Sequence, residues 1–66
     1  MIRVVVADDQ QLIRAVFAAL LASEPDIAVV GQAVTGREAV RQVTRHCPDV
    51  VLMDIRMSTA GRETGR

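Results

Sequence analysis

The sequence predicts an α/β fold in which three parallel strands alternate with two helices. Short apolar runs occur at residues 2–7 (IRVVVA), 27–34 (IAVVGQAV) and 50–53 (VVLM), with segments of helical periodicity between them. Apolarity that is nearly continuous rather than alternating is typical of parallel strands covered on both faces. Strand–helix alternation favours a parallel sheet with right-handed crossovers. The chain has 66 residues, 50% of them hydrophobic, which is enough for one small domain of marginal stability.

The first helix is marked by an apolar stripe that follows the first strand at once. Its members recur at helical spacing and are Leu12, Val16, Phe17, Leu20 and Leu21. Asp9 or Gln10 can cap the start of this helix. The helix should end before Pro25, because the residue preceding a proline is disfavoured in the helical region.

The second helix begins at a capping box, Thr35-Gly-Arg-Glu38, in which the Thr35 hydroxyl can accept from the Glu38 amide. We expect this helix to run to about His46 and to direct Ala39, Val40 and Val43 inward. In the strand before it, Gly31 indicates a weak point or a place of close backbone approach. Asp49 then opens the third strand, which ends at Asp54.

Composition excludes several classes of partner. Eight acidic residues balance eight basic ones, so the chain lacks the excess of positive charge that binding to nucleic acid or to an anionic membrane surface usually requires. We find no signal peptide and no apolar run of the ~18 residues that a membrane span needs. A single cysteine, Cys47, fits a reducing compartment. These features predict a cytoplasmic protein without a membrane partner.

Three carboxylates stand at the ends of two predicted strands. Asp8 and Asp9 follow the first strand and Asp54 follows the third. Parallel strands end at the same edge of a sheet, which is the edge where open α/β sheets bind ligands. If the two strands are neighbours, ~4.8 Å apart, the three side chains lie within reach of one another.

Such a cluster needs compensation, because two carboxylates ~4 Å apart repel by about 4 kcal/mol at an effective dielectric near 20. A hard divalent cation removes the conflict, and Mg²⁺ prefers oxygen ligands. Each residue alone also has a plainer explanation: Asp9 as a helix N-cap, Asp8 as a solvated strand end, Asp54 as the start of a turn. Their joint placement nevertheless predicts a Mg²⁺ site at this edge.

The chain resembles the receiver domain of two-component response regulators. The resemblance rests on the opening DDxxLxR, the middle segment EPDIxVVGxAxxG and the segment PDVVLMDIRM, which look most like the NarL/LuxR branch. It covers Ile2 to Met57, so that residues 1–57 correspond to the N-terminal part of a receiver and residues 58–66 form a divergent tail. The fold that it implies is part of a flavodoxin-like sheet with strand order 2-1-3.

The resemblance also implies roles for individual residues. Asp54 matches the aspartate that accepts a phosphoryl group from a sensor histidine kinase. Asp8 and Asp9 match the acidic pair that holds Mg²⁺, with Asp9 the more direct ligand. Arg56 matches the position whose backbone carbonyl completes the metal site. The implied function is a signalling domain in a phosphorelay that regulates transcription, with no enzymatic activity of its own.

The sequence departs from the family pattern at Ser58, where TAGRETGR replaces the expected loop and third helix. In the family, a hydroxyl residue on the fourth strand and a lysine on the fifth strand contact the phosphoryl group. This sequence contains no lysine, and it lacks the segment that would supply the hydroxyl residue. The helix-turn-helix DNA-binding domain that is usual in this branch is absent too. We therefore expect a truncated receiver; a natural truncation and a frameshift both remain open. Phosphotransfer to Asp54 should be poor.

Two other functions fit parts of the sequence. The chain could be an inactive remnant that acts as an interaction or dimerisation module, self-associating through its uncovered sheet edge. A nucleotide-binding α/β unit is disfavoured, since Gly31 and Gly36 do not form G-x-G-x-x-G after the first strand and no Walker lysine exists.

Overall fold

The computed structural model describes residues 1–54 and has the predicted α/β architecture. The elements in chain order are β1 (Ile2–Ala7), α1 (Gln11–Ala22), β2 (Ile27–Ala33), α2 (Gly36–His46) and β3 (Val50–Met53). The strand order is β2-β1-β3 and both pairings are parallel, which confirms the predicted order 2-1-3. The predictions for Arg56, for the boundary at Met57 and for the tail at 58–66 lie outside the described residues.

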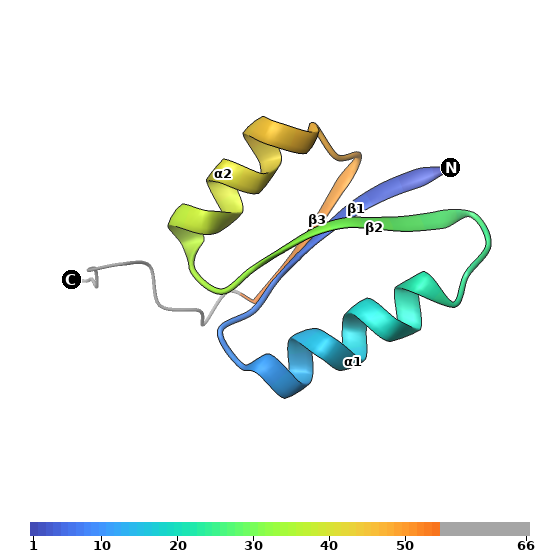
Figure 1. Cartoon of the computed structure of the whole chain (residues 1–66), viewed down its shortest axis with the longest axis horizontal. Helices are drawn as coiled ribbons and strands as arrows, with labels where there is room; N and C mark the ends of the chain where they lie inside the picture. The colour runs from blue at the N-terminus through green and yellow to red at the C-terminus, as the bar shows by residue number, and fades with distance from the viewer. Residues whose placement is uncertain (55–66) are drawn as a thin grey trace.

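The core is built around β1, the central strand. β1 pairs with β2 on one side and with β3 on the other, and α1 and α2 lie on opposite faces of the sheet (Figure 1). Because β1 is covered from every direction, its last four residues are buried, and Val5 and Val6 are the largest fully buried side chains among the described residues. This central position explains the continuous apolar run that begins at Val4.

Gly31 lies at an irregularity of the sheet. The register of β1 against β2 shifts after Val4, so that Val4 pairs with Val29 while Val5 pairs with Gly31. A Cβ atom at Gly31 would lie 3.3 Å from Cδ2 of His46 and would meet the side-chain carboxamide of Gln42. The expected close approach is therefore real, and α2 is the element that approaches.

The helix ends follow the sequence signals in outline. α1 ends at Ala22, before Pro25, and α2 ends at His46. At the start of α2, Thr35 Oγ1 accepts from the Glu38 amide at 3.1 Å. The Glu38 carboxylate accepts from the amide of Val34 at 2.9 Å, one residue earlier than the usual capping box. Gln10 rather than Asp9 occupies the N-cap of α1, without a side-chain capping bond.

The prediction that Ala39, Val40 and Val43 all face inward is wrong for two of the three. Ala39 is buried, whereas Val40 is 66% and Val43 is 36% exposed. α2 packs mainly on β2 and β1, and Ala39 is its only buried residue. The stripe on α1 is exposed for the same reason, since α1 also packs mainly on these two strands.

Within the part of the chain that the structure describes, neither helix has the length and apolarity required to cross a membrane.

Candidate metal centre

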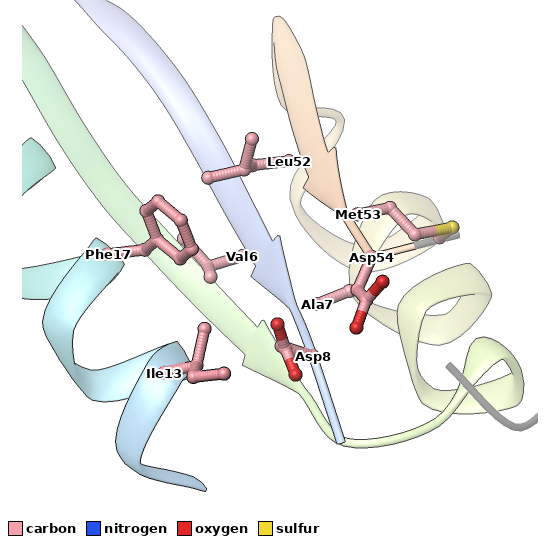
Figure 2. A pocket seen from close by; sticks show the side chains of 8 residues that line it. All are labelled: Val6, Ala7, Asp8, Ile13, Phe17, Leu52, Met53 and Asp54. Atoms are coloured by element: carbon pink, nitrogen blue, oxygen red, sulfur yellow. The ribbon is translucent and has the colours of Figure 1, made fainter. Parts of the chain in front are cut away.

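The three predicted carboxylates converge at the carboxyl edge of the sheet. β1 and β3 are parallel neighbours with Ala7 opposite Met53, so the residues that follow them, Asp8 and Asp54, leave the sheet at the same level. The side chains of both point into one space, as Figure 2 shows. One carboxylate oxygen from each of Asp8, Asp9 and Asp54 lies within 4.8 Å of the others. The juxtaposition expected from the sequence is therefore present.

The backbone holds this arrangement by continuing both strand pairings for one residue. The Asp8 amide donates to the carbonyl of Ala33 at 3.0 Å, and the Asp54 amide donates to the carbonyl of Ala7 at 3.1 Å. Each acidic position is thus tied to a neighbouring strand, and the separation of the two carboxylates is set by the strand spacing.

The three carboxylates differ in exposure. Asp8 is 5% exposed, and its Oδ1 accepts from the amide of Gln10 at 2.9 Å, an Asx-type turn that leads into α1. Such a bond compensates part of the cost of burying a charged group. Asp9 is exposed and Asp54 is half-buried. The site therefore combines one buried carboxylate with two that solutes can reach.

Arg14 is a part of the site that sequence reasoning missed. Its Nη1 donates to the backbone carbonyl of Asp8 at 3.0 Å, and its Nε donates to Oε1 of Gln32 at 3.1 Å. One guanidinium thus joins the acidic turn to α1 and to the end of β2. In the sequence, Arg14 stands out only as the arginine of the DDxxLxR pattern. That pattern does not predict a hydrogen bond to a main-chain carbonyl.

We expect Arg14→Met to loosen the acidic turn while the sheet stays intact. Hydrogen bonds from a charged donor contribute ~1.5–3 kcal/mol, and the partial exposure of Arg14 reduces this to about 1 kcal/mol. The amides of Asp8 and Gln10 should then exchange with solvent roughly fivefold faster. NMR-detected hydrogen exchange measures this, with Arg41→Met on the exposed surface of α2 as the control. Equal acceleration in both variants would contradict the assigned role.

An apolar cavity of about 410 Å³ adjoins the carboxylates. Ile13 and Phe17 of α1 line one wall, and Val6 and Leu52 of the sheet line the other (Figure 2). Asp8 and Asp54 stand at its polar end. The donor set of three carboxylates fits a hard, oxygen-preferring cation such as Mg²⁺. Arg56, predicted to add a backbone carbonyl, lies outside the described residues.

Comparisons with known proteins agree on one family. The family model described as response regulator receiver domain matches residues 4–64. Over 57 residues the chain is 47% identical to the transcriptional regulatory protein LiaR of Bacillus subtilis, covering 86% of this chain and 27% of LiaR. Over 56 residues it is 52% identical to a protein-glutamate methylesterase/protein-glutamine glutaminase of a Nocardioides species, covering 85% of this chain and 15% of the relative. The chain thus spans a minor part of each relative.

Solved structures give the same result. The chain superposes on the response regulator domain of Thermotoga maritima CheB with a TM-score of 0.83 and 46% identity, over 86% of this chain and 42% of that one. It also superposes on a structure of the CheA3 P1 domain in complex with CheY6 from R. sphaeroides, with a TM-score of 0.80 and 33% identity, over 86% and 45% of the two chains. The chain has a parallel β2-β1-β3 sheet with an acidic carboxyl edge, and the family model, the relatives and the solved structures all point to the same family. This chain therefore belongs to the response regulator receiver domains of two-component systems.

Proposed function

We propose that the chain is a phosphoacceptor module in which Asp54 receives a phosphoryl group and the acidic pair Asp8 and Asp9 holds Mg²⁺. The observation that carries the proposal is the convergence of the three carboxylates, within 4.8 Å, at the edge where β1 and β3 end. Family membership adds the chemistry. A carboxylate oxygen of Asp54 attacks phosphorus, the bond from phosphorus to the donor breaks, and an acyl phosphate remains on Asp54.

The three carboxylates differ in exposure, and we assign their roles accordingly. Asp54 is half-buried and borders the open cavity, so a donor can approach it. Asp9 is exposed and suits the more direct contact with the cation, while the buried Asp8, bonded to the Gln10 amide, keeps the pair in place. A bound Mg²⁺ would neutralise charge on the transferring phosphoryl group. The carbonyl of Arg56 is proposed as a further ligand on the resemblance alone.

A sensor histidine kinase is the proposed donor. The likeness to a chain solved with the CheA3 P1 domain and CheY6 supports a kinase partner. A role in transcription regulation draws support from LiaR, although the relative from Nocardioides is a methylesterase/glutaminase, so the output domain is not specified by the receiver part. The cytoplasmic location remains a prediction from the sequence.

Mg²⁺ binding is the first expected result. Titration followed by amide chemical shifts should show weak binding, with the largest changes at Asp8, Asp9 and Asp54. Removing one of three charged ligands should weaken the affinity at least about tenfold, because each partly buried ion–ligand contact contributes about 1.4 kcal/mol or more. Asp9→Ala and Asp54→Ala are the test variants, and Asp26→Ala, at an exposed position just before β2, is the control. Variants that bind as well as the parent would rule out the site.

Phosphorylation is tested with acetyl phosphate. Incubation of the chain with acetyl phosphate and Mg²⁺, followed by intact mass measurement, should reveal one added phosphoryl group that peptide mapping places on Asp54. The product should be absent without Mg²⁺ and in Asp54→Asn, and present in Asp26→Asn. Incorporation that persists in Asp54→Asn would show that another residue is the acceptor.

An interaction module is the second candidate, favoured by the exposure of Val50, Leu52 and Met53 on the edge strand β3. Such an edge offers unpaired backbone groups to another chain, and self-association is the simplest consequence.

A further inference from the structure

Helix α2 carries a row of arginines on its outer surface. Arg37, Arg41 and Arg45 are four residues apart along the helix, and all three are exposed. Residues at this spacing lie on one face of an α-helix. Ala39, the buried residue of α2, lies on the opposite face, which packs on β2 and β1 (Figure 1). The three arginine side chains, called here the arginine row, therefore lie on the side of α2 that faces away from the sheet.

The charge of the arginine row has no counterpart within residues 1–54. There, the arginine side chains that donate hydrogen bonds are those of Arg3 and Arg14, and no guanidinium of the row has a hydrogen bond or an ion pair. Glu38 supplies the only carboxylate of α2, and that carboxylate accepts from the amide of Val34 at 2.9 Å. The row is thus a set of three positive charges that the described part of the chain does not neutralise.

Helix stability does not account for the arginine row. Arg37 with Arg41, and Arg41 with Arg45, set like charges at i, i+4 spacing, which destabilises a helix. Arg37 also lies in the first turn, where the helix dipole disfavours positive charge, and only Arg45, in the last turn, is placed favourably. A solvated helix face is more stable when carboxylates stand four residues from the arginines. The row therefore costs α2 stability, and a partner of opposite charge would remove that cost.

We infer that the arginine row docks an acidic α-helix of another protein, one that carries carboxylates at every fourth position. Successive members of the row are about 6 Å apart along the axis of α2, and glutamates four residues apart on a second helix have the same spacing. Such rows align when two helices cross at about −50°. Each guanidinium can then meet one carboxylate in the charge-assisted geometry that arginine favours. Neither Mg²⁺ nor a phosphoryl group takes part in this docking.

The surface beside the row leaves room for the side chains of such a helix. A hollow of about 420 Å³ lies there, lined by Val40, Arg41, Gln42, Thr44 and Arg45. Two members of the row thus border a depression rather than a flat surface.

Two other occupants fit the arginine row less well. The acidic edge of a second copy of this chain is too compact, because its three carboxylate oxygens lie within 4.8 Å of one another whereas the row spans about 12 Å. Nucleic acid is disfavoured because the chain has no net positive charge. The one aromatic side chain that could stack on a base, Phe17, belongs to α1 on the other face of the sheet (Figure 1).

The probe is a ~20-residue alanine-rich peptide with glutamates at every fourth position, which is long enough to be helical in isolation. Titrated into the full 66-residue chain without Mg²⁺ at about 0.1 M salt, it should bind weakly, with the largest amide shifts at the arginine row. A control peptide of the same composition, with its glutamates spread around the helix, should bind at least about threefold more weakly. At about 1 M salt, binding of the probe should be lost.

Two triple variants that lower the net charge by the same amount test the row itself. Replacing all three of its arginines with glutamine should weaken probe binding about tenfold or more, roughly two- to threefold for each exposed ion pair. The control combines Gln11→Glu, Ala15→Glu and Ala19→Glu, three exposed positions of α1 at the same four-residue spacing. It should stay within about twofold of the parent, because α1 lies across the sheet and charges at about 0.1 M salt are screened beyond roughly 10 Å.

Stability and binding should move in opposite directions in one further variant. Arg41→Gln removes both like-charge pairs of the row and preserves helix propensity, so it should raise the thermal midpoint of the chain by about 2 °C or more. The same substitution should weaken probe binding about two- to threefold. Unfolding therefore cannot account for the loss of binding.

Several results would overturn the inference. They are equal binding of the two peptides, equal weakening by the two triple variants, a thermal midpoint that falls in Arg41→Gln, and tighter binding of a DNA duplex than of the probe at the same salt concentration. The last would make nucleic acid the occupant. All of these measurements are independent of phosphorylation, so failure of the proposed phosphoacceptor role would leave them unaffected.

Discussion

Phosphorylation of Asp54 in this 66-residue chain should be at least about 100-fold slower than in the Thermotoga maritima CheB receiver domain under the same acetyl phosphate and Mg²⁺ concentrations. The reason is the lack of preorganised donors for the phosphoryl oxygens. Loss of one such donor typically costs about 10²–10³ in rate. The resemblance assigns this role to a lysine and a hydroxyl residue on later strands, and the sequence contains no lysine.

Neither Arg14 nor Arg3 replaces that lysine. Arg14 lies next to the acidic turn, but its guanidinium donates to the Asp8 carbonyl and to Gln32. Arg3 is at the opposite end of β1, where it donates to the carbonyl of His46. Among the described residues, neither of these two guanidiniums is placed to stabilise a phosphoryl group on the proposed acceptor Asp54.

Time courses of phosphoryl incorporation into this chain and into the CheB receiver domain measure the difference in rate. Circular dichroism of the two proteins at the assay temperature controls for unfolding of the shorter chain. An incorporation rate equal to that of the Thermotoga maritima receiver would contradict the expectation.

The parallel strands were predictable because they depend on simple periodicity, whereas the strand order 2-1-3 was implied by the family resemblance. Continuous apolar runs identified the parallel strands, and parallel strands bring their following residues to one edge. The pattern of residues alone was therefore enough to place Asp8, Asp9 and Asp54 at one edge of the sheet, and their proximity depends on β1 and β3 being neighbours. The role of Asp54 came from the resemblance, since position alone does not separate a ligand from a nucleophile.

Other features depend on how elements pack, which the sequence pattern does not encode. Val40 lies next to the buried Ala39 along α2, yet it is 66% exposed. The Arg14 bond to a main-chain carbonyl depends on the angle at which α1 leaves β1. The register shift between Val4 and Val5 and the close approach of α2 to Gly31 likewise became visible only in the structure. Tertiary contacts decided each of these cases.

The isolated chain should associate in a concentration-dependent manner. Its exposed apolar side chains include four of the five residues of the α1 stripe, with Leu12 and Leu20 the most exposed, together with Val50, Leu52 and Met53 of β3. A small domain buries only ~60% of the surface of its unfolded chain, so this further exposure removes stabilisation that it needs. Association through the apolar surfaces recovers part of the hydrophobic free energy.

Sedimentation and thermal circular dichroism at several concentrations test this expectation. For a dimer, a tenfold rise in concentration contributes about 1.4 kcal/mol, which should raise the melting midpoint by several degrees in a chain of this size. Leu52→Lys, which places a charge on the edge strand, should reduce the association, as charged residues do on natural sheet edges. Arg41→Lys, on the exposed surface of α2, should leave it unchanged. A monodisperse monomer with a sharp melt that is independent of concentration would show that the three-stranded sheet is stable without a partner.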